Sequence, residues 1–292
     1  MNKTAIAVLT RVPDQKQLLF YSEFQNHGFE VFFFIDDNEY KVEKCLKARY
    51  IQIDEKECIR YGFYNFAPPP KCGAWDKALY YFCRLHNDYA NVWFVEDDVF
   101  IPNCQTLLDI DRRYGDSDII SAPNIVNRAG LLDDWHWWKH IPDRMLPPPW
   151  CKAMVCGVRL SNELLKSVNE FIEAHSTRLR ITNEISKLYN TSVRRRVASL
   201  LGFKIKKKHL KYLFIEYIFH TIALHNNKRI VGAEELESIV WRKVWRVQDM
   251  NEECLYHPIK DIAAHEFYRV QIRERARSWA RPNLPGRPPP ND

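Results

Sequence analysis

Three consecutive carboxylates, Glu96, Asp97 and Asp98, interrupt the apolar run VWFVEDDVFI at residues 92–101. A carboxylate buried without a partner is costly, so a strand is not expected to carry three acids without a use. Alternation along an extended chain places Glu96 and Asp98 on one side and Asp97 on the other. Carboxylates clustered at a strand end are typical ligands of Mg²⁺ or Mn²⁺, which also bind substrate phosphates. The pattern predicts a divalent-cation site; a solvated turn, or one acid paired with an arginine, remains the alternative.

Glu216 is the single carboxylate in the apolar run YLFIEYIFHTIAL at residues 212–224. An acid inside such a run is either paired with a cation or directed at a site. Burial raises the pKa of a carboxyl group toward the range that suits a general base. Glu216 is therefore a candidate base, with Asp133 and Asp134 as rivals and a structural ion pair as the alternative.

The elements that must position these acids alternate between strand and helix in the first half of the chain. Buried strands are predicted at residues 5–10, 29–36, 50–54, 91–97 and 117–123, with helices at about 14–25 and 74–85. Such alternation predicts an α/β fold with an open, mostly parallel sheet flanked by helices. Ligands of these sheets bind at the carboxyl ends of the strands. Polar residues gather there: Thr10, Arg11, Asp36 and Asp37, besides the three acids.

The second half of the chain is less regular. A loop rich in aromatic residues and prolines spans 133–150, and a strand-like run, KAMVCGVRLS, ends at Ser161, a residue that favours the start of a helix. Helices are expected at 162–174, 212–227 and about 264–279, with a short strand at 228–232. The basic segment 194–211 suits a solvated face, or contact with phosphates, a membrane surface or a polyanion.

Composition narrows the functional classes. The 292 residues are 46% hydrophobic, enough for a large core, and the net charge of +6 is too mild to demand a nucleic-acid partner. None of the eight cysteines forms a CxxC pair, which argues against a zinc module and favours reduced thiols in an intracellular protein. We find neither a signal peptide nor an apolar run of about 18 residues, so we expect no transmembrane segment and a cytoplasmic location.

Four short motifs occur in an order that resembles glycosyltransferases of the GT-A fold. They are VEDDV for the DxD-type motif, VCGVRLS with Gly157 for the glycine loop, FIEYIF with Glu216, and LYHPIKD with His257. The resemblance implies a nucleotide-diphospho-sugar donor and a bound Mn²⁺ or Mg²⁺. It makes Asp98 the best metal ligand, with Glu96 and His257 completing the shell, although His257 also fits an exposed loop. Asp97 or Glu96 would then reach the donor ribose or a metal-bound water.

The resemblance also implies where the donor nucleotide binds. Thr10, Arg11, Asp36 and Asp37 would contact the base and ribose, whereas Asp and Asn in DDNE equally favour a simple turn. Three residues open the helix before the metal strand: Trp75, Asp76 and Lys77. Lys77 would meet a phosphate, or Asp76 would simply cap that helix. Gly157 would let the backbone approach the sugar closely, or would mark a bulge in a strand.

The stretch WHWW supplies aromatic rings for an acceptor. Because sugars present apolar C–H faces that stack on aromatic rings, Trp135, Trp137 and Trp138 are interpreted as an acceptor wall. A hydrophobic plug under the proline-rich loop is the alternative.

These expectations describe one GT-A-like catalytic domain over residues 1–263, followed by a C-terminal helix and proline-rich tail at 264–292. Residues 1–125 would form the nucleotide-sugar half and 126–263 the acceptor half. The enzyme would use a UDP-sugar rather than a GDP-sugar, UDP-xylose being one candidate, and would transfer with inversion onto a glycan or glycoprotein. Similar cytosolic enzymes occur in microbes and large algal DNA viruses. A nucleotidyltransferase-type enzyme and a catalytically silent carbohydrate-binding protein stay open.

Overall fold

Seven strands form one sheet in the order β3-β2-β1-β4-β8-β5-β9. The structure is a computed structural model, which describes residues 3–37, 39–40, 49–64, 72–132, 135–191, 200–201 and 208–280. The strands are β1 (Thr4–Thr10), β2 (Phe29–Ile35), β3 (Arg49–Ile51), β4 (Asn91–Glu96), β5 (Ile119–Ser121), β8 (Gly157–Ser161) and β9 (Ile230–Gly232). All neighbouring pairs are parallel except those of β8, which runs antiparallel to both β4 and β5. The predicted open, mostly parallel α/β sheet is therefore confirmed.

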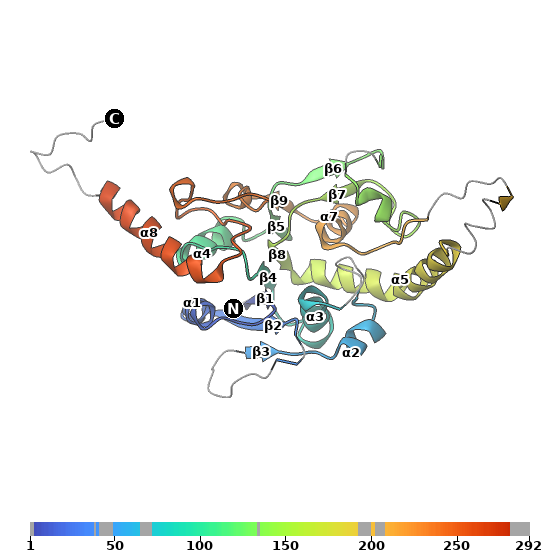
Figure 1. Ribbon diagram of the computed structural model, residues 1–292, viewed down its shortest axis with the longest axis horizontal. Coiled ribbons are helices and arrows are strands. Elements are labelled where there is room, and N and C mark those ends of the chain that lie inside the picture. Colours follow the sequence, from blue (N-terminus) through green and yellow to red (C-terminus); the bar gives the residue numbers. More distant parts are fainter. Residues whose placement is uncertain are drawn as a thin grey trace, which may run out of the picture.

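Helices cover both faces of this sheet (Figure 1). The helices are α1 (Gln15–Gln25), α2 (Glu55–Arg60), α3 (Ala74–Tyr80), α4 (Cys104–Arg113), α5 (Asn162–Tyr189), α7 (Ile215–His225) and α8 (Ile262–Ala280). In Figure 1, α1, α4 and α8 lie on one side of the sheet, and α3, α5 and α7 lie on the other. Because both faces are covered, β1 and β2 carry nearly continuous apolar runs, as buried parallel strands do.

Side chains at the helix starts explain where α1 and α5 begin. The Asp14 carboxylate accepts from the backbone N–H of Lys16, and the side-chain oxygen of Gln17 accepts from the backbone N–H of Asp14, as in a capping box. Ser161 Oγ accepts from the backbone N–H of Leu164 at 3.1 Å, so this residue is the N-cap of α5, as the sequence predicts. The helix continues to Tyr189, well beyond the expected 162–174.

Short elements fill the segment between β5 and β8. Strands β6 (Ile125–Asn127) and β7 (Trp150–Lys152) pair with each other outside the main sheet, and a 3-10 turn spans Trp138–His140. The expected strand at 152–161 is therefore two strands, β7 and β8, separated by four residues that make no strand pairing. Further short turns are the π-helical turn Tyr81–Leu85 and the 3-10 turns Glu234–Leu236 and Val247–Asp249.

The C-terminal helix α8 packs on the rest of the fold through one face. The Arg269 guanidinium lies 3.6 Å from the ring centre of Phe20, and its Nε donates to the carbonyl of Ile101 at 3.1 Å. Ile272 is buried beside Phe100 and Tyr256 in a separate small apolar cluster. None of the helices in the described ranges has both the length and the apolar character needed to cross a membrane.

Candidate active site

The carboxyl ends of β1, β2 and β4 converge, as predicted. The backbone N–H of Asp36, just past β2, donates to Thr10 O at 2.9 Å, and that of Asp97, just past β4, donates to Leu9 O at 3.0 Å. On the other side of β4, Glu96 N donates to Cys156 O at 2.8 Å. Polar residues from separate strands thus share one edge of the sheet.

The acids of the EDD motif divide as alternation predicts. Glu96 and Asp98 both face His257: its Nε2 lies 3.3 Å from Asp98 Oδ1 and 3.9 Å from Glu96 Oε2. Asp97 points elsewhere, because its Oδ2 accepts from Thr10 Oγ1 at 2.8 Å. Glu96 Oε1 also accepts from the indole N–H of Trp75 at 2.8 Å, which holds this carboxylate in place.

Neighbouring backbone groups orient the His257 ring. Its Nδ1 lies 2.7 Å from the carbonyl of Val240, and because a carbonyl only accepts, Nδ1 carries the proton. The indole of Trp245 donates to the carbonyl of His257 at 3.0 Å. Nε2 is therefore the nitrogen directed at the two acids, an arrangement that metal-binding histidines share.

The charge of Asp98 is stabilised by Lys260 and by His257. Burial alone would raise its pKa, but bonds from His257 and from Lys260, whose Nζ is ion-paired with Asp98 Oδ2, lower the pKa to about 2. Burial raises the pKa of Glu96, against the bond from Trp75 and with the adjacent charge of Asp98. Burial would lower the pKa of His257, but Asp98 reverses this and raises it.

These groups fit a divalent cation. Asp98 Oδ1 is buried, and its neighbour among the described residues is His257 Nε2 at 3.3 Å, without the geometry of a regular hydrogen bond. A metal ion placed between these two atoms could accept both as ligands. Glu96, His257 and the thiol of Cys156 place donor atoms within 4.8 Å of one another. Two carboxylates and an imidazole suit Mn²⁺ or Mg²⁺ completed by phosphate oxygens, whereas the thiol is a softer donor.

The helix that precedes β4 contributes structure more than ligand contacts. Asp76 is fully buried and accepts from Gly73 N at 2.9 Å, which confirms the capping interpretation. Lys77 is also fully buried, and its Nζ donates to the carbonyls of Ile35 at 3.0 Å and Asp36 at 2.9 Å. This lysine ties α3 to the end of β2, and its contact with a phosphate stays a prediction.

The remaining predicted donor-site residues lie around the same edge. Arg11 is exposed, and Asp36 and Asp37 are half-buried. Asp37 Oδ1 accepts from Glu39 N at 2.9 Å, as in the simple turn that the sequence allowed.

Gly157 begins β8 and packs inward. A Cβ built there would lie 2.9 Å from Ile239 Cδ1 and 3.7 Å from Leu255 Cδ2. The missing side chain makes room for neighbouring core residues, and the approach of a sugar to this backbone stays a prediction.

Glu216 lies in the first turn of α7 and lines a cavity of about 570 Å³. Trp135, Trp137 and Lys152 line the same cavity. Burial, reinforced by the charge of Glu96, raises the pKa of Glu216 to about 7, although Lys152 and His257 act in the opposite direction. The charges of Glu96 and His257 thus affect the pKa of Glu216, which lines the aromatic cavity.

Three further predicted residues lie outside this cavity or outside the described residues. Trp138 is 2% exposed and stacks on Trp150 with ring centres 5.8 Å apart, so it belongs to the core and not to an acceptor wall. This corrects its assignment and fits the hydrophobic-plug alternative for that residue. Asp133 and Asp134 lie outside the described residues.

Sequence reasoning missed several residues that the structure brings to the site. Lys260 stands three positions after His257 in HPIK, and Cys156 directly precedes Gly157, so both were within reach of the motifs already singled out. Trp241 and Arg242 complete the cavity of Glu216, and Trp241 is 65% exposed. No sequence pattern links them to Trp135, because only the fold places them together.

Several solved structures are distantly similar to the chain, and one of them is described here. The crystal structure of mouse xyloside xylosyltransferase 1 in its apo form is 13% identical, with a TM-score of 0.37, over 80% of this chain and 85% of that chain. No family model and no curated protein matches the chain. A likeness this distant carries no functional argument, so the function proposed below rests on the geometry of the site.

Proposed function

We propose that this protein is a metal-dependent glycosyltransferase that uses a nucleotide-diphospho-sugar. The observation that carries the proposal is the pairing of Asp98, Glu96 and His257 at the carboxyl ends of the strands with an aromatic cavity that holds Glu216. Asp98, Glu96 and His257 suit a cation and a diphosphate. The aromatic cavity suits a sugar whose hydroxyl group would lie beside Glu216 as the general base. A phosphate site alone would not require the tryptophan-lined cavity.

The chain's own residues divide the work of transfer between leaving group and acceptor. A divalent cation held by Asp98, Glu96 and His257 would neutralise charge that develops on the departing diphosphate. The ammonium group of Lys260, 78% exposed beside Asp98, adds positive charge on the solvent side of the same site. Thr10 holds Asp97 in position at the donor edge through its hydroxyl bond.

The acceptor would enter the cavity of about 570 Å³ and stack on Trp135 and Trp137. Glu216, with its raised pKa, would take the proton of the attacking hydroxyl, a role that implies direct displacement and inversion at the anomeric carbon. We assign a UDP-sugar as the donor, with UDP-xylose one candidate, and a glycan or glycoprotein as the acceptor. Mn²⁺ or Mg²⁺ is the expected cation.

The test is calorimetric titration of UDP with and without Mn²⁺. We expect the wild-type protein to bind UDP only when Mn²⁺ is present, and Asp98→Asn to lose this metal-dependent binding because Asn has no charge to hold the cation. Asp88→Asn, which removes an exposed aspartate, is the matched control and should bind like the wild type. Unchanged metal-dependent affinity in Asp98→Asn would remove Asp98 from the site.

The donor's sugar and its nucleobase are then identified by a hydrolysis screen over UDP-sugars and GDP-sugars in the presence of Mn²⁺. Slow release of UDP from one of them would separate a working transferase from a silent carbohydrate-binding protein. Binding of nucleoside triphosphates, with no binding of any nucleotide-sugar, would overturn the proposal in favour of a nucleotidyltransferase.

A further inference from the structure

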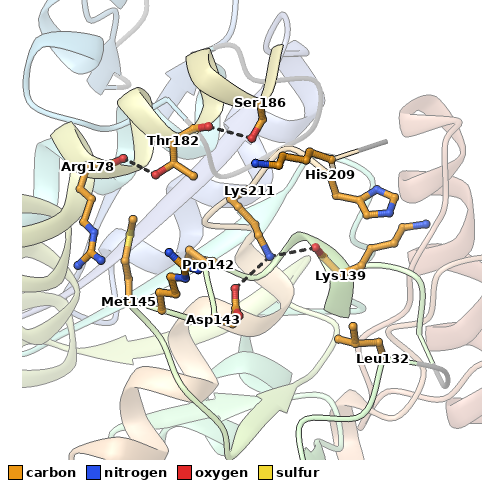
Figure 2. A pocket seen from close by; sticks show the side chains of 12 residues that line it. Leu132, Lys139, Pro142, Asp143, Met145, Arg178, Thr182, Ser186, His209 and Lys211 are labelled. Carbon is orange, nitrogen blue, oxygen red and sulfur yellow. Dashed lines mark hydrogen bonds and ion pairs between the residues drawn. The ribbon is translucent and has the colours of Figure 1, made fainter. Parts of the chain in front are cut away.

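A second cavity, of about 470 Å³, lies between α5 and the segments 139–145 and 208–211 (Figure 2). It shares no lining residue with the cavity of Glu216. Six of its lining residues are basic: Lys139, Arg144, Arg178, Lys208, His209 and Lys211. The last part of the basic segment 194–211, residues 208–211, therefore forms one wall of a cavity that is open to solvent.

The positive charge of this second cavity is only partly balanced. Its one carboxylate among the described lining residues, Asp143, is paired with Lys211 at 3.1 Å. Lys211 Nζ also donates to the carbonyls of Ile141 at 2.7 Å and Lys139 at 3.3 Å, as Figure 2 shows in part. This lysine therefore holds the segment 139–143 in place.

Four of the other basic side chains, Lys139, Arg144, Arg178 and Lys208, form no ion pair within the described ranges. Lys208 lies 4.5 Å from the ring centre of Tyr189, a contact that leaves its charge uncompensated. Several like charges around one hollow are unfavourable unless an anion joins them.

Two asparagines fix the walls in advance of any ligand. Asn183, which is buried, exchanges two hydrogen bonds with the backbone of Lys211, at 2.7 and 2.8 Å. Asn190 does the same with the backbone of Lys208, at 2.7 and 2.9 Å. The segment 208–211 is thereby clamped to α5, so the basic side chains need little ordering when a ligand binds.

The remaining lining adds apolar surface and two hydroxyl groups. Leu132, Pro142 and Met145 are apolar. The hydroxyls of Thr182 and Ser186 donate to carbonyls one turn back in α5, at 2.8 and 2.9 Å, which leaves their oxygens as acceptors. A volume of about 470 Å³ falls within the range of small-molecule sites, roughly 300–1,000 Å³. The cavity thus suits a ligand with a charged end and a sugar-sized body.

We propose that this second cavity is a binding site for a phosphate monoester carried by a sugar-sized molecule. Guanidinium and ammonium groups bind phosphate oxygens through charge-assisted hydrogen bonds, and Arg178 and Lys139 offer such donors from two sides of the cavity. The segment 135–140 lies between the two cavities, because Trp135 and Trp137 line one and Lys139 lines the other. The phosphate therefore belongs either to a free molecule or to the acceptor itself.

Inorganic phosphate is the probe for the charged end. Binding is measured by calorimetry in metal-free buffer at constant ionic strength, on the wild type, Arg178→Gln and Arg180→Gln. Arg180 lies on the same helix, is exposed and does not line the cavity. Arg180→Gln therefore removes one charge of the same kind outside the cavity and is the matched control. We expect Arg178→Gln to weaken binding roughly tenfold, as for the loss of one charged hydrogen bond, and Arg180→Gln to leave it unchanged.

Lys139→Gln should also weaken phosphate binding, because Lys139 lines the same cavity as Arg178. Phosphate that binds elsewhere, including the edge near Lys260, would be unaffected by either substitution. Absence of saturable binding, or equal losses in Arg178→Gln and Arg180→Gln, would overturn the proposal.

To identify the source of the phosphate, a sugar and its phosphate monoester are compared as ligands and as acceptors. If the phosphate belongs to the acceptor, transfer to the phosphorylated sugar should show a KM several-fold below that of the plain sugar, and Arg178→Gln should abolish the difference. If it belongs to a free molecule, the sugar phosphate should bind without being an acceptor. The acceptor comparison rests on the proposed transferase activity, whereas the phosphate titration does not. Failure of the proposed site can therefore be distinguished from failure of the proposed function.

Discussion

Glu216 carries the clearest consequence of a single residue. Its pKa is raised to about 7 by burial and by the charge of Glu96, so at neutral pH it is ionised in only part of the molecules. A general base must be ionised to accept a proton. We therefore expect the transfer rate to rise with pH through about 7. In Glu216→Gln, turnover should fall by about 10²–10⁴-fold with donor affinity unchanged; full turnover in the folded variant would send the search for the base elsewhere.

The same pKa shift predicts how Glu216 affects stability. A carboxyl group whose folded pKa lies above its ordinary value of 4.5 favours folding below that value and loses this contribution as pH rises toward 7. Glu216→Gln should therefore melt at a higher temperature than the wild type at pH 8, and the difference should shrink toward pH 4.5. A structural ion pair predicts the reverse, with the variant less stable at pH 8. Melting curves at the two pH values decide between them.

His257 should matter less to metal binding than Asp98. The imidazole is one neutral donor in a shell that the carboxylates and the substrate phosphates also supply. We expect His257→Ala to weaken Mn²⁺ affinity by a smaller factor than Asp98→Asn, measured by titration in the presence of UDP. His27→Ala, which removes an exposed imidazole, is the control. A loss in His257→Ala as large as that in Asp98→Asn would show that the ring does more than complete the shell.

At the scale of elements, one glycine fixes how closely the end of α2 approaches α5. Gly62 has φ of +92°, and a Cβ there would lie 2.5 Å from the Cβ of Ser176. Gly28 has a similar φ of +85° but nothing within 4 Å. Gly28→Ala should therefore cost about 1–2 kcal/mol of unfolding free energy for backbone strain alone. Gly62→Ala should cost about 1–3 kcal/mol more, for the clash.

Denaturant unfolding of both variants gives the comparison. Because the two positions share nearly the same backbone angle, the difference between them isolates the packing of α2 on α5. Equal losses would mean that α5 shifts away without cost.

The sequence predicts most elements here because their signals are local. Buried parallel strands appear as apolar runs, and Ser161 marks a helix start whatever follows it. The direction of β8 is not a local property: nothing in GVRLS distinguishes a strand that pairs antiparallel with β4 from one that pairs parallel. The length of α5 also depends on tertiary support, since Asn183 and Asn190 are polar positions that bind the segment 208–211.

The candidate site follows the same division between local and distant signals. Alternation along one strand is sufficient to separate Asp97 from Glu96 and Asp98. The three tryptophans of WHWW cannot be told apart in this way, because the 3-10 turn at Trp138–His140 determines which ring enters the core. Lys260 shows the intermediate case, a residue in a recognised motif whose partner is visible only in the fold.

For the whole molecule, ligand binding should stabilise the entire fold, because the site joins β4 to the segment before α8. Saturating UDP with Mn²⁺, at about 100 times the dissociation constant, adds about 2.7 kcal/mol to the unfolding free energy. A domain of this size should then melt roughly 5 °C higher. Mn²⁺ alone and the Asp98→Asn protein are the controls, and a shift retained in Asp98→Asn would place the nucleotide elsewhere.

Asp98 and Lys260 are 162 positions apart, and the backbone of Ile259 bonds to Asp98 O at 2.8 Å while Phe100 pairs with Tyr256. During synthesis on the ribosome, β1, β2 and β4 emerge long before the histidine and lysine that face them. A nascent chain can therefore form its first parallel strands while it still lacks the histidine and the lysine of the proposed cation and diphosphate site. Chains released early by stalled translation would therefore lack part of the proposed site, and any activity of that site would come only with near-complete translation.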